Sequence, residues 1–130
     1  MRLIVIVLTA SLAAACASGT PTTPDPVADV NTFSSSVAAG SAASRQFDVT
    51  TGGTVSVRLS STNPDGVVLG LGVGIPRSDG SCAVSSAVDT AAGEDAQLAV
   101  TTGAGTYCAR VHDPGTLSAL VSFTLVISRP

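Results

Sequence analysis

The chain has few aromatic side chains. Of its 130 residues only 3% are aromatic, one tyrosine and three phenylalanines with no tryptophan, although 45% are hydrophobic. Proteins that recognise sugars or nucleobases commonly stack aromatic rings on their ligands, so the shortage counts against both kinds of binding site. Abundant Val, Leu, Ile and Ala still supply enough apolar surface for a folded domain, which sets the chain apart from disordered sequences.

Positive charge is also scarce. The chain has no lysine, and its arginines stand singly at Arg2, Arg45, Arg58, Arg77, Arg110 and Arg129. Removal of Arg2 with the leader described below leaves five bases against nine acids, a net charge of −4. No basic stripe is present for phosphates, so we expect no nucleic-acid partner and no electrostatic attraction to an anionic membrane surface.

Catalytic and zinc-binding motifs are missing from the sequence. His112 is the one histidine, and neither H-E-x-x-H nor G-x-S-x-G occurs. A zinc site needs three or four ligands, which this chain cannot assemble from His and Cys. His112 lies in a His-Asp-Pro-Gly segment that is typical of a turn. Adjacent carboxylates at Glu94 and Asp95 fit a solvated loop better than a catalytic pair. We therefore predict no catalytic residue, no metal ligand and no cofactor.

Acidic residues in the expected loops leave a calcium site as a weaker alternative. They are Asp79, Asp89, Glu94, Asp95 and Asp113. Oxygen ligands from loops suit calcium, but the D-x-[DN]-x-[DN]-G pattern is absent. Solubility of the surface is the favoured explanation for these acids.

The first fifteen residues have the three parts of a secretory signal. A positive Met1-Arg2 start precedes an apolar stretch from Leu3, and the stretch ends on small residues at Ala15. A membrane-spanning helix needs about 20 apolar residues, and the chain turns polar at Ser18, before that length is reached. The sequence therefore predicts a signal peptide over residues 1–15 and an exported protein.

The end of this leader resembles a bacterial lipobox, in which small residues precede a cysteine. Leu12-Ala13-Ala14-Ala15-Cys16 carries the resemblance, although the family pattern places Leu three residues before the cysteine, where this chain has Ala13. The resemblance implies that Cys16 is lipidated and becomes the mature N-terminus, anchored to a bacterial membrane in the cell envelope. An ordinary A-x-A cut after Ala15 remains the alternative and would give a plainly secreted protein.

Residues 16–30 form a Ser/Thr/Pro-rich linker behind that cysteine. Its composition, as in Thr20-Pro21-Thr22-Thr23-Pro24, is typical of a flexible spacer and would let an anchored domain stand off a bilayer. Three cysteines in an exported protein need an explanation, because disulfides use them in pairs. Lipidation of Cys16 would leave Cys82 and Cys108 as a pair.

Residues 31–130 show the period-two alternation of half-buried strands. The alternating runs are Phe33–Val37, Arg45–Val49, Val55–Leu59, Leu69–Ile75, Leu98–Val100, Tyr107–Val111 and Val121–Ile127. Turn signals such as Asn63-Pro64-Asp65-Gly66 and Gly103-Ala104-Gly105 separate them. Seven or eight short strands at this spacing predict an all-β, two-sheet sandwich, with a jelly roll favoured over other Greek-key arrangements.

The predicted strand Val67–Ile75 has an unusual face. Its apolar residues alternate with Gly70, Gly72 and Gly74, so one side carries no side chains. Glycine inside a strand is destabilising by roughly 0.5–1 kcal/mol relative to alanine and marks close approach of another group. We expect another segment to pack over this face; a flat platform for a ligand and a curved strand are the alternatives.

Cys82 and Cys108 are expected to form a disulfide, because an exported protein meets an oxidising compartment. The pair would close a loop of about 27 residues, worth roughly 3.5 kcal/mol in the chain-entropy model. Cys108 has the opposite parity to Tyr107 and Ala109 in its strand. We therefore predict a bridge on the less buried side of that strand, joining it to the region Arg77–Cys82.

The region from Val37 to Ile127 resembles the bacterial pre-peptidase C-terminal family. Phe47-Asp48-Val49 with Gly53–Val57, Leu69–Gly74, Gly103–Val111 and Val121–Leu125 carry the resemblance. It implies a jelly-roll-like sandwich of the kind appended to exported enzymes, yet no protease domain is attached here. No catalytic residue carries over.

These observations favour a non-enzymatic exported lipoprotein whose sandwich is an interaction module for a protein or glycan partner. Recognition of glycan or peptidoglycan by a sandwich face is the alternative, weakened by the aromatic shortage. An enzyme ranks third, and would require His112 to face a pocket with a serine and an acid within hydrogen-bond reach.

Overall fold

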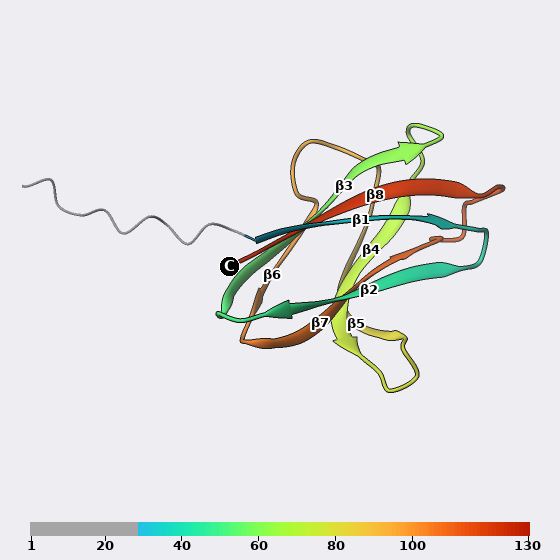
Figure 1. The fold of residues 1–130 in the computed structure, drawn as a ribbon. Coiled ribbons are helices and arrows are strands. Elements are labelled where there is room, and N and C mark those ends of the chain that lie inside the picture. The colour runs from blue at the N-terminus through green and yellow to red at the C-terminus, as the bar shows by residue number, and fades with distance from the viewer. Residues whose placement is uncertain (1–28) are drawn as a thin grey trace, which may run out of the picture.

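The computed structural model describes residues 29–130, and this part of the chain contains eight strands and no helix. The strands are β1 (Asp29–Val37), β2 (Ala42–Val49), β3 (Gly53–Asn63), β4 (Leu69–Pro76), β5 (Cys82–Thr90), β6 (Leu98–Thr102), β7 (Gly105–His112) and β8 (Val121–Arg129) (Figure 1). The all-β prediction is confirmed. The predicted signal peptide, Cys16 and nearly all of the linker lie outside the described residues.

The strands form two four-stranded antiparallel sheets. One sheet has the order β1-β8-β3-β6 and the other β2-β7-β4-β5. Apart from β4 and β5, which are neighbours, consecutive strands lie in opposite sheets, so the chain passes repeatedly from one layer to the other (Figure 1). Eight strands connected in this way make a jelly roll, which confirms the predicted two-sheet sandwich.

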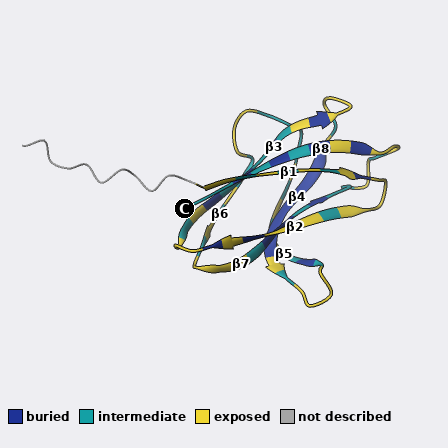
Figure 2. Cartoon of the chain, in the orientation of Figure 1, coloured by how far each residue is buried: buried dark blue, intermediate teal, exposed yellow. Residues whose placement is uncertain are grey.

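The core lies between the sheets and is built from alternate positions of the strands. Val55, Val57 and Leu59 of β3 and Leu69, Leu71 and Val73 of β4 belong to it, and along β3 and β8 buried residues alternate with half-buried or exposed ones (Figure 2). Successive side chains of a strand point to opposite faces, so a period-two pattern puts one apolar set inside. The other buried members of the core are Val37, Phe47, Val49, Ala109, Val111, Val121, Phe123, Leu125 and Ile127.

All four aromatic rings pack in two pairs. Phe33 of β1 meets Phe123 of β8 edge-on, with ring centroids 5.5 Å apart, and Phe47 of β2 stacks on Tyr107 of β7 at 6.1 Å. The guanidinium of Arg45 lies 5.5 Å from the centroid of the Phe33 ring, so one side chain from each sheet meets at the β1–β2 side of the sandwich. The few aromatics of the chain are therefore used for packing.

Two details of the strands differ from the sequence-based expectation. The alternating runs do not include β5, because Ser85, Ser86 and Ala87 give little contrast between its two faces. Strand β4 begins at Leu69, so Val67 and Val68, predicted to start that strand, belong instead to the preceding loop. The second difference matters for the site described below.

The glycine face of β4 is covered by groups from its two neighbouring strands. A Cβ at Gly70 would meet the imidazole of His112 on β7, and one at Gly72 would lie 2.8 Å from a methyl of Val84 on β5. At Gly74 a Cβ would run into the backbone carbonyl of Ala83. The expectation that another segment packs closely over this face is correct.

The start of β5 reaches across β4 to β7 through the predicted disulfide. Cys82 and Cys108 are bonded, with their Cα atoms 5.8 Å apart, although β4 separates their strands in the sheet. The bridge lies outside the main core, on the side of β7 opposite Ala109 and Val111, as parity predicts. That side of β7 is the less buried one, as predicted, although the bridge itself is covered: Cys108 is 1% and Cys82 7% exposed, because the start of β5 lies over the glycine face.

Candidate functional site

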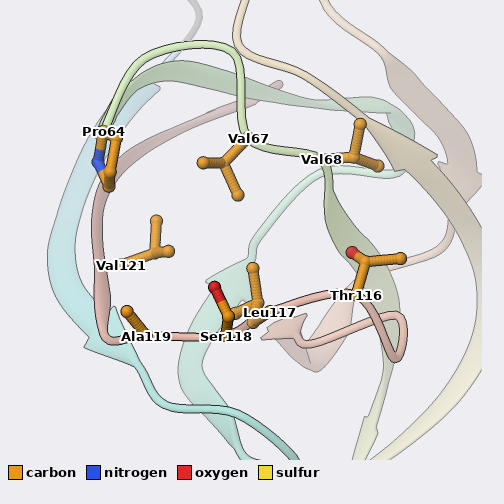
Figure 3. Close-up of a pocket in the computed structure, with 8 residues that line it drawn as sticks. All are labelled: Pro64, Val67, Val68, Thr116, Leu117, Ser118, Ala119 and Val121. Carbon is orange, nitrogen blue, oxygen red and sulfur yellow. The ribbon is translucent and has the colours of Figure 1, made fainter.

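Two loops enclose an apolar pocket at one end of the sandwich. The β3–β4 loop, residues 64–68, forms one wall, and the β7–β8 loop with the start of β8 forms the other (Figure 3). The cavity has a volume of about 450 Å³ and is lined by Pro64, Val67, Val68, Thr116, Leu117, Ser118, Ala119 and Val121. We call it the end pocket. Its size lies within the ~300–1,000 Å³ that is usual for small-molecule sites.

The first wall is held by the end of β3. The buried Thr62 donates a hydrogen bond from Oγ1 to the carbonyl oxygen of Pro64, 2.9 Å away. Gly66 then takes a φ of 78°, in the left-handed region that favours glycine, and turns the chain back. This turn brings Val67 over the hollow, where it faces Leu117 of the other wall (Figure 3).

Asp113 shapes the second wall. Its Oδ1 accepts hydrogen bonds from the backbone N–H groups of Gly115, Thr116 and Leu117 at 2.8–3.1 Å. Its Oδ2 accepts a fourth from the N–H of Gly40, in the turn that joins β1 to β2. The hydrogen bond from the Gly40 N–H has the largest effect, and together with the other three amides it lowers the pKa of Asp113 from its ordinary value of 3.8 to about 2. One carboxylate thus fixes the loop and ties it to a neighbouring turn.

Protonation of Asp113 is expected to loosen this wall. Because the folded pKa lies below the unfolded one, the stabilisation is fully present above about pH 4 and is lost as pH falls toward about 2. The substitution Asp113→Asn, which removes the acceptor for Gly40, should lower Tm at pH 7 by on the order of 5 °C. It should also flatten the dependence of Tm on pH between 4 and 2. Asp65→Asn, at an exposed position on the facing loop, is the control, and equal effects of the two substitutions would contradict this role.

The rim of the end pocket exposes aliphatic side chains. Val68 is 41% exposed and Leu120, between two residues of the lining, is 64% exposed. Loops usually carry polar residues at such positions, whereas these two loops and the start of β8 place six aliphatic residues around one hollow. A concave apolar site with a few polar groups is the common form of a ligand site.

His112, predicted to lie in a turn, is instead the last residue of β7. Its imidazole packs on Gly70 of the neighbouring strand, and its Nδ1 is buried without a hydrogen-bond partner. It does not line the end pocket. The turn begins one residue later, at Asp113.

The acidic residues considered for calcium lie apart in the structure. Asp79 accepts hydrogen bonds from the hydroxyl and N–H of Ser81, which lower its pKa and explain it as a turn residue. Asp89 is the penultimate residue of β5 and so lies next to a loop, as expected. No cluster of three metal-ligating side chains forms among residues 29–130.

A second hollow lies over the outer side of the β1-β8-β3 part of the sheet and has a different chemistry. It is lined mainly by hydroxyl and amide side chains, with a volume of about 370 Å³. Its lining residues are Ser34, Ser35, Ser61, Thr62, Asn63, Ser122, Phe123 and Thr124. We call it the hydroxyl hollow. The hydroxyls of Ser34 and Thr124 lie 3.1 Å apart across β1 and β8, so some of its polar groups already pair with each other.

Of the predicted special residues, Cys82 and Cys108 are joined as expected, and Cys16 lies outside the described part of the chain. The end pocket was not predicted from the sequence. Two signals point to it: Val67-Val68 follow a turn, and Leu117, Ala119 and Leu120 interrupt a connection that should be polar.

Neither a scan against protein-family models nor a search of curated proteins finds a match for this chain. The resemblance to the pre-peptidase C-terminal family therefore stays a prediction. Residues 29–130 contain no helix long and apolar enough to cross a membrane.

Proposed function

We propose that this protein is a non-enzymatic, exported lipoprotein, anchored through Cys16, whose sandwich is a binding module with the end pocket as its binding site. The observation that carries the proposal is the end pocket itself. It gathers aliphatic residues from two loops and leaves Val68 and Leu120 exposed at its rim. Its lining offers hydroxyls but no histidine, cysteine or carboxylate, which supports binding over catalysis.

The cysteine count supports the anchor. The disulfide uses two of the three cysteines, so Cys16 is the remaining one. A lipid on Cys16 explains why an exported chain has an odd number of cysteines. The lipobox-like residues before Cys16 point to the same modification.

The position of the pocket fits an anchored module. Asp29 pairs with Arg129 at one end of the β1–β8 ladder, whereas Val37 pairs with Val121, a lining residue, at the other. The chain preceding Asp29 thus joins the end of this ladder away from the pocket (Figure 1). Twelve residues separate Cys16 from Asp29 and span at most roughly 45 Å when extended. An anchor at Cys16 would therefore be attached at the end of the domain opposite the pocket, which leaves the pocket mouth clear of the tether.

Replacement of Cys16 tests the anchor. In cells fed radiolabelled palmitate, Cys16→Ser should reduce incorporation to background and move the protein from the membrane fraction to the soluble fraction. Ser18→Ala, two residues away, should keep both label and membrane association. Undiminished labelling of the Cys16→Ser protein would contradict lipidation at this site.

The hydroxyl hollow favours a second candidate function, recognition of a glycan or peptidoglycan. Ser34, Ser61 and Asn63 present neutral donors and acceptors on a sheet face, which suits an uncharged polyhydroxyl ligand. No ring of the two aromatic pairs is free to stack on a sugar from that hollow, since Phe123 is buried. A glycan array without signal would rule out this function.

A further inference from the structure

We infer that the end pocket takes the alkyl chain of an uncharged amphiphile, with the head group left at the mouth. The inference rests on the proposed function, because it treats the end pocket as the binding site of the module. It goes further by assigning the chemical class of the ligand.

The walls of the end pocket match a hydrocarbon. Six of the eight lining residues are aliphatic, and Figure 3 shows Val67 and Leu117 turned toward the same hollow with Val121 at its side. No aromatic ring lines it, so the stacking that holds sugars and bases is unavailable there. Burial of CH2 groups is the interaction that such walls provide.

The polar groups near the mouth suit an uncharged head group. Thr116 and Ser118 are the two hydroxyl-bearing residues of the lining, and hydroxyls donate and accept hydrogen bonds without carrying charge. No arginine lines the pocket, so its lining offers no cation to pair with a carboxylate or phosphate head group. An unpaired charge against these aliphatic walls would be costly, which disfavours such head groups.

The extent of the apolar surface favours a small ligand over a protein. Among the described residues, only four large hydrophobic side chains are exposed, and Val30 and Ile75 lie outside the two pocket loops. Val68 and Leu120 are thus the only exposed members of this group at the rim. A stable protein interface buries about 800 Å² on each partner, far more than two side chains supply.

The test is a chemical-shift titration of the exported chain carrying Cys16→Ser, which removes the acyl anchor as a competing hydrocarbon. The probes are hexyl, heptyl and octyl glucoside below their micelle concentrations, with methyl glucoside and octanoate as comparisons. We expect shifts clustered on Val67, Val68, Leu117 and Ala119. Each added CH2 should raise affinity about fourfold, because every buried CH2 contributes a similar increment. Octanoate should bind at least tenfold more weakly than octyl glucoside.

A matched pair of variants locates the site. Ala119→Leu places extra side-chain volume in the exposed wall of the pocket and should weaken octyl glucoside binding at least tenfold. Ala104→Leu makes the same change in the exposed β6–β7 connection and should leave binding unchanged. Should Ala119→Leu fail to fold, the chain-length series on the unaltered pocket still decides the question.

Each contrary result overturns the inference in a recognisable way. Chemical shifts with methyl glucoside equal to those with octyl glucoside would mean that the sugar is recognised. An affinity that does not depend on chain length would mean that the pocket does not bind the alkyl chain. Octanoate binding as tightly as octyl glucoside would remove the charge argument. Palmitate labelling of Cys16 tests the anchor separately from the ligand. A labelled protein that does not bind alkyl chains would keep the anchor and lose this inference, whereas an unlabelled protein that binds them would keep the inference and lose the anchor.

Discussion

Replacement of Cys82 and Cys108 by alanine is expected to lower the free energy of unfolding by about 3–4 kcal/mol. The bridge spans 26 positions of the sequence, and a cross-link over that length removes about this much loop-closure entropy from the unfolded chain. Both sulfurs are buried, so their removal also leaves small voids. For a domain of about 100 residues, the expected fall in Tm is roughly 15–25 °C, measured by thermal denaturation followed by circular dichroism.

Reduction of the bridge, with Cys82 and Cys108 both kept, separates the loss of the cross-link from the loss of side-chain volume. A chain that carries Cys16→Ser keeps both bridge sulfurs when unfolded in dithiothreitol, so it loses the cross-link without losing volume. Reduction should lower its free energy of unfolding by most of the amount expected for the double alanine variant. A reduced protein as stable as the oxidised one would show that the bridge contributes nothing to the fold.

Substitution of Gly74 by alanine is expected to destabilise the domain by about 3 kcal/mol or more. A Cβ at this position meets the backbone carbonyl of Ala83, and backbone cannot turn aside as a flexible side chain can. The start of β5 would have to move away from β4, and Cys82 would move with it. Urea unfolding measures the loss.

Two other glycines calibrate this result. At Gly72 the new methyl group would press on the side chain of Val84, which can partly yield, so a loss of about 1–2 kcal/mol is expected. At Gly103 nothing lies within 4 Å, and alanine should change stability by less than about 0.5 kcal/mol. A Gly74→Ala protein as stable as Gly103→Ala would contradict the close approach of β5.

The sheet architecture could be predicted because its determinants are local. Val55, Val57 and Leu59 alternate with polar residues, and such alternation fixes both the strand and its buried face. Periodicity does not predict strand β5, because small residues fill its centre, where Ser85 and Ala87 point away from the core. Periodicity gives no signal when both faces of a strand carry side chains of similar size and polarity.

The face of the disulfide followed from parity, but its burial did not. Alternation places Cys108 opposite Ala109, on the less buried face of β7, but it does not show which segment covers that face. The glycines of β4 let the start of β5 lie on that face and cover the bridge. The packing of the start of β5 over the glycine face of β4 depends on the path of the whole chain. A local sequence pattern carries no information about that path.

The end pocket required the topology. Val67 and Leu117 are fifty positions apart and meet because β3 and β8 are neighbours, so the loops next to them converge. Apolar residues in a single loop carry little information, since isolated exposed hydrophobic residues are common. Only their convergence makes a site.

The ion pair between Arg129 and Asp29, 2.8 Å long, has a mechanical consequence. Arg129 also donates a hydrogen bond to the carbonyl oxygen of Asp48, so this one side chain links the end of β8 to the start of β1 and to the end of β2. Strands β1 and β8 are antiparallel, and a force that draws their clasped ends apart acts along the inter-strand hydrogen bonds. The bonds would break one pair after another from Asp29 toward Val37, so the domain should yield to a smaller load in this direction than to one applied along its strands.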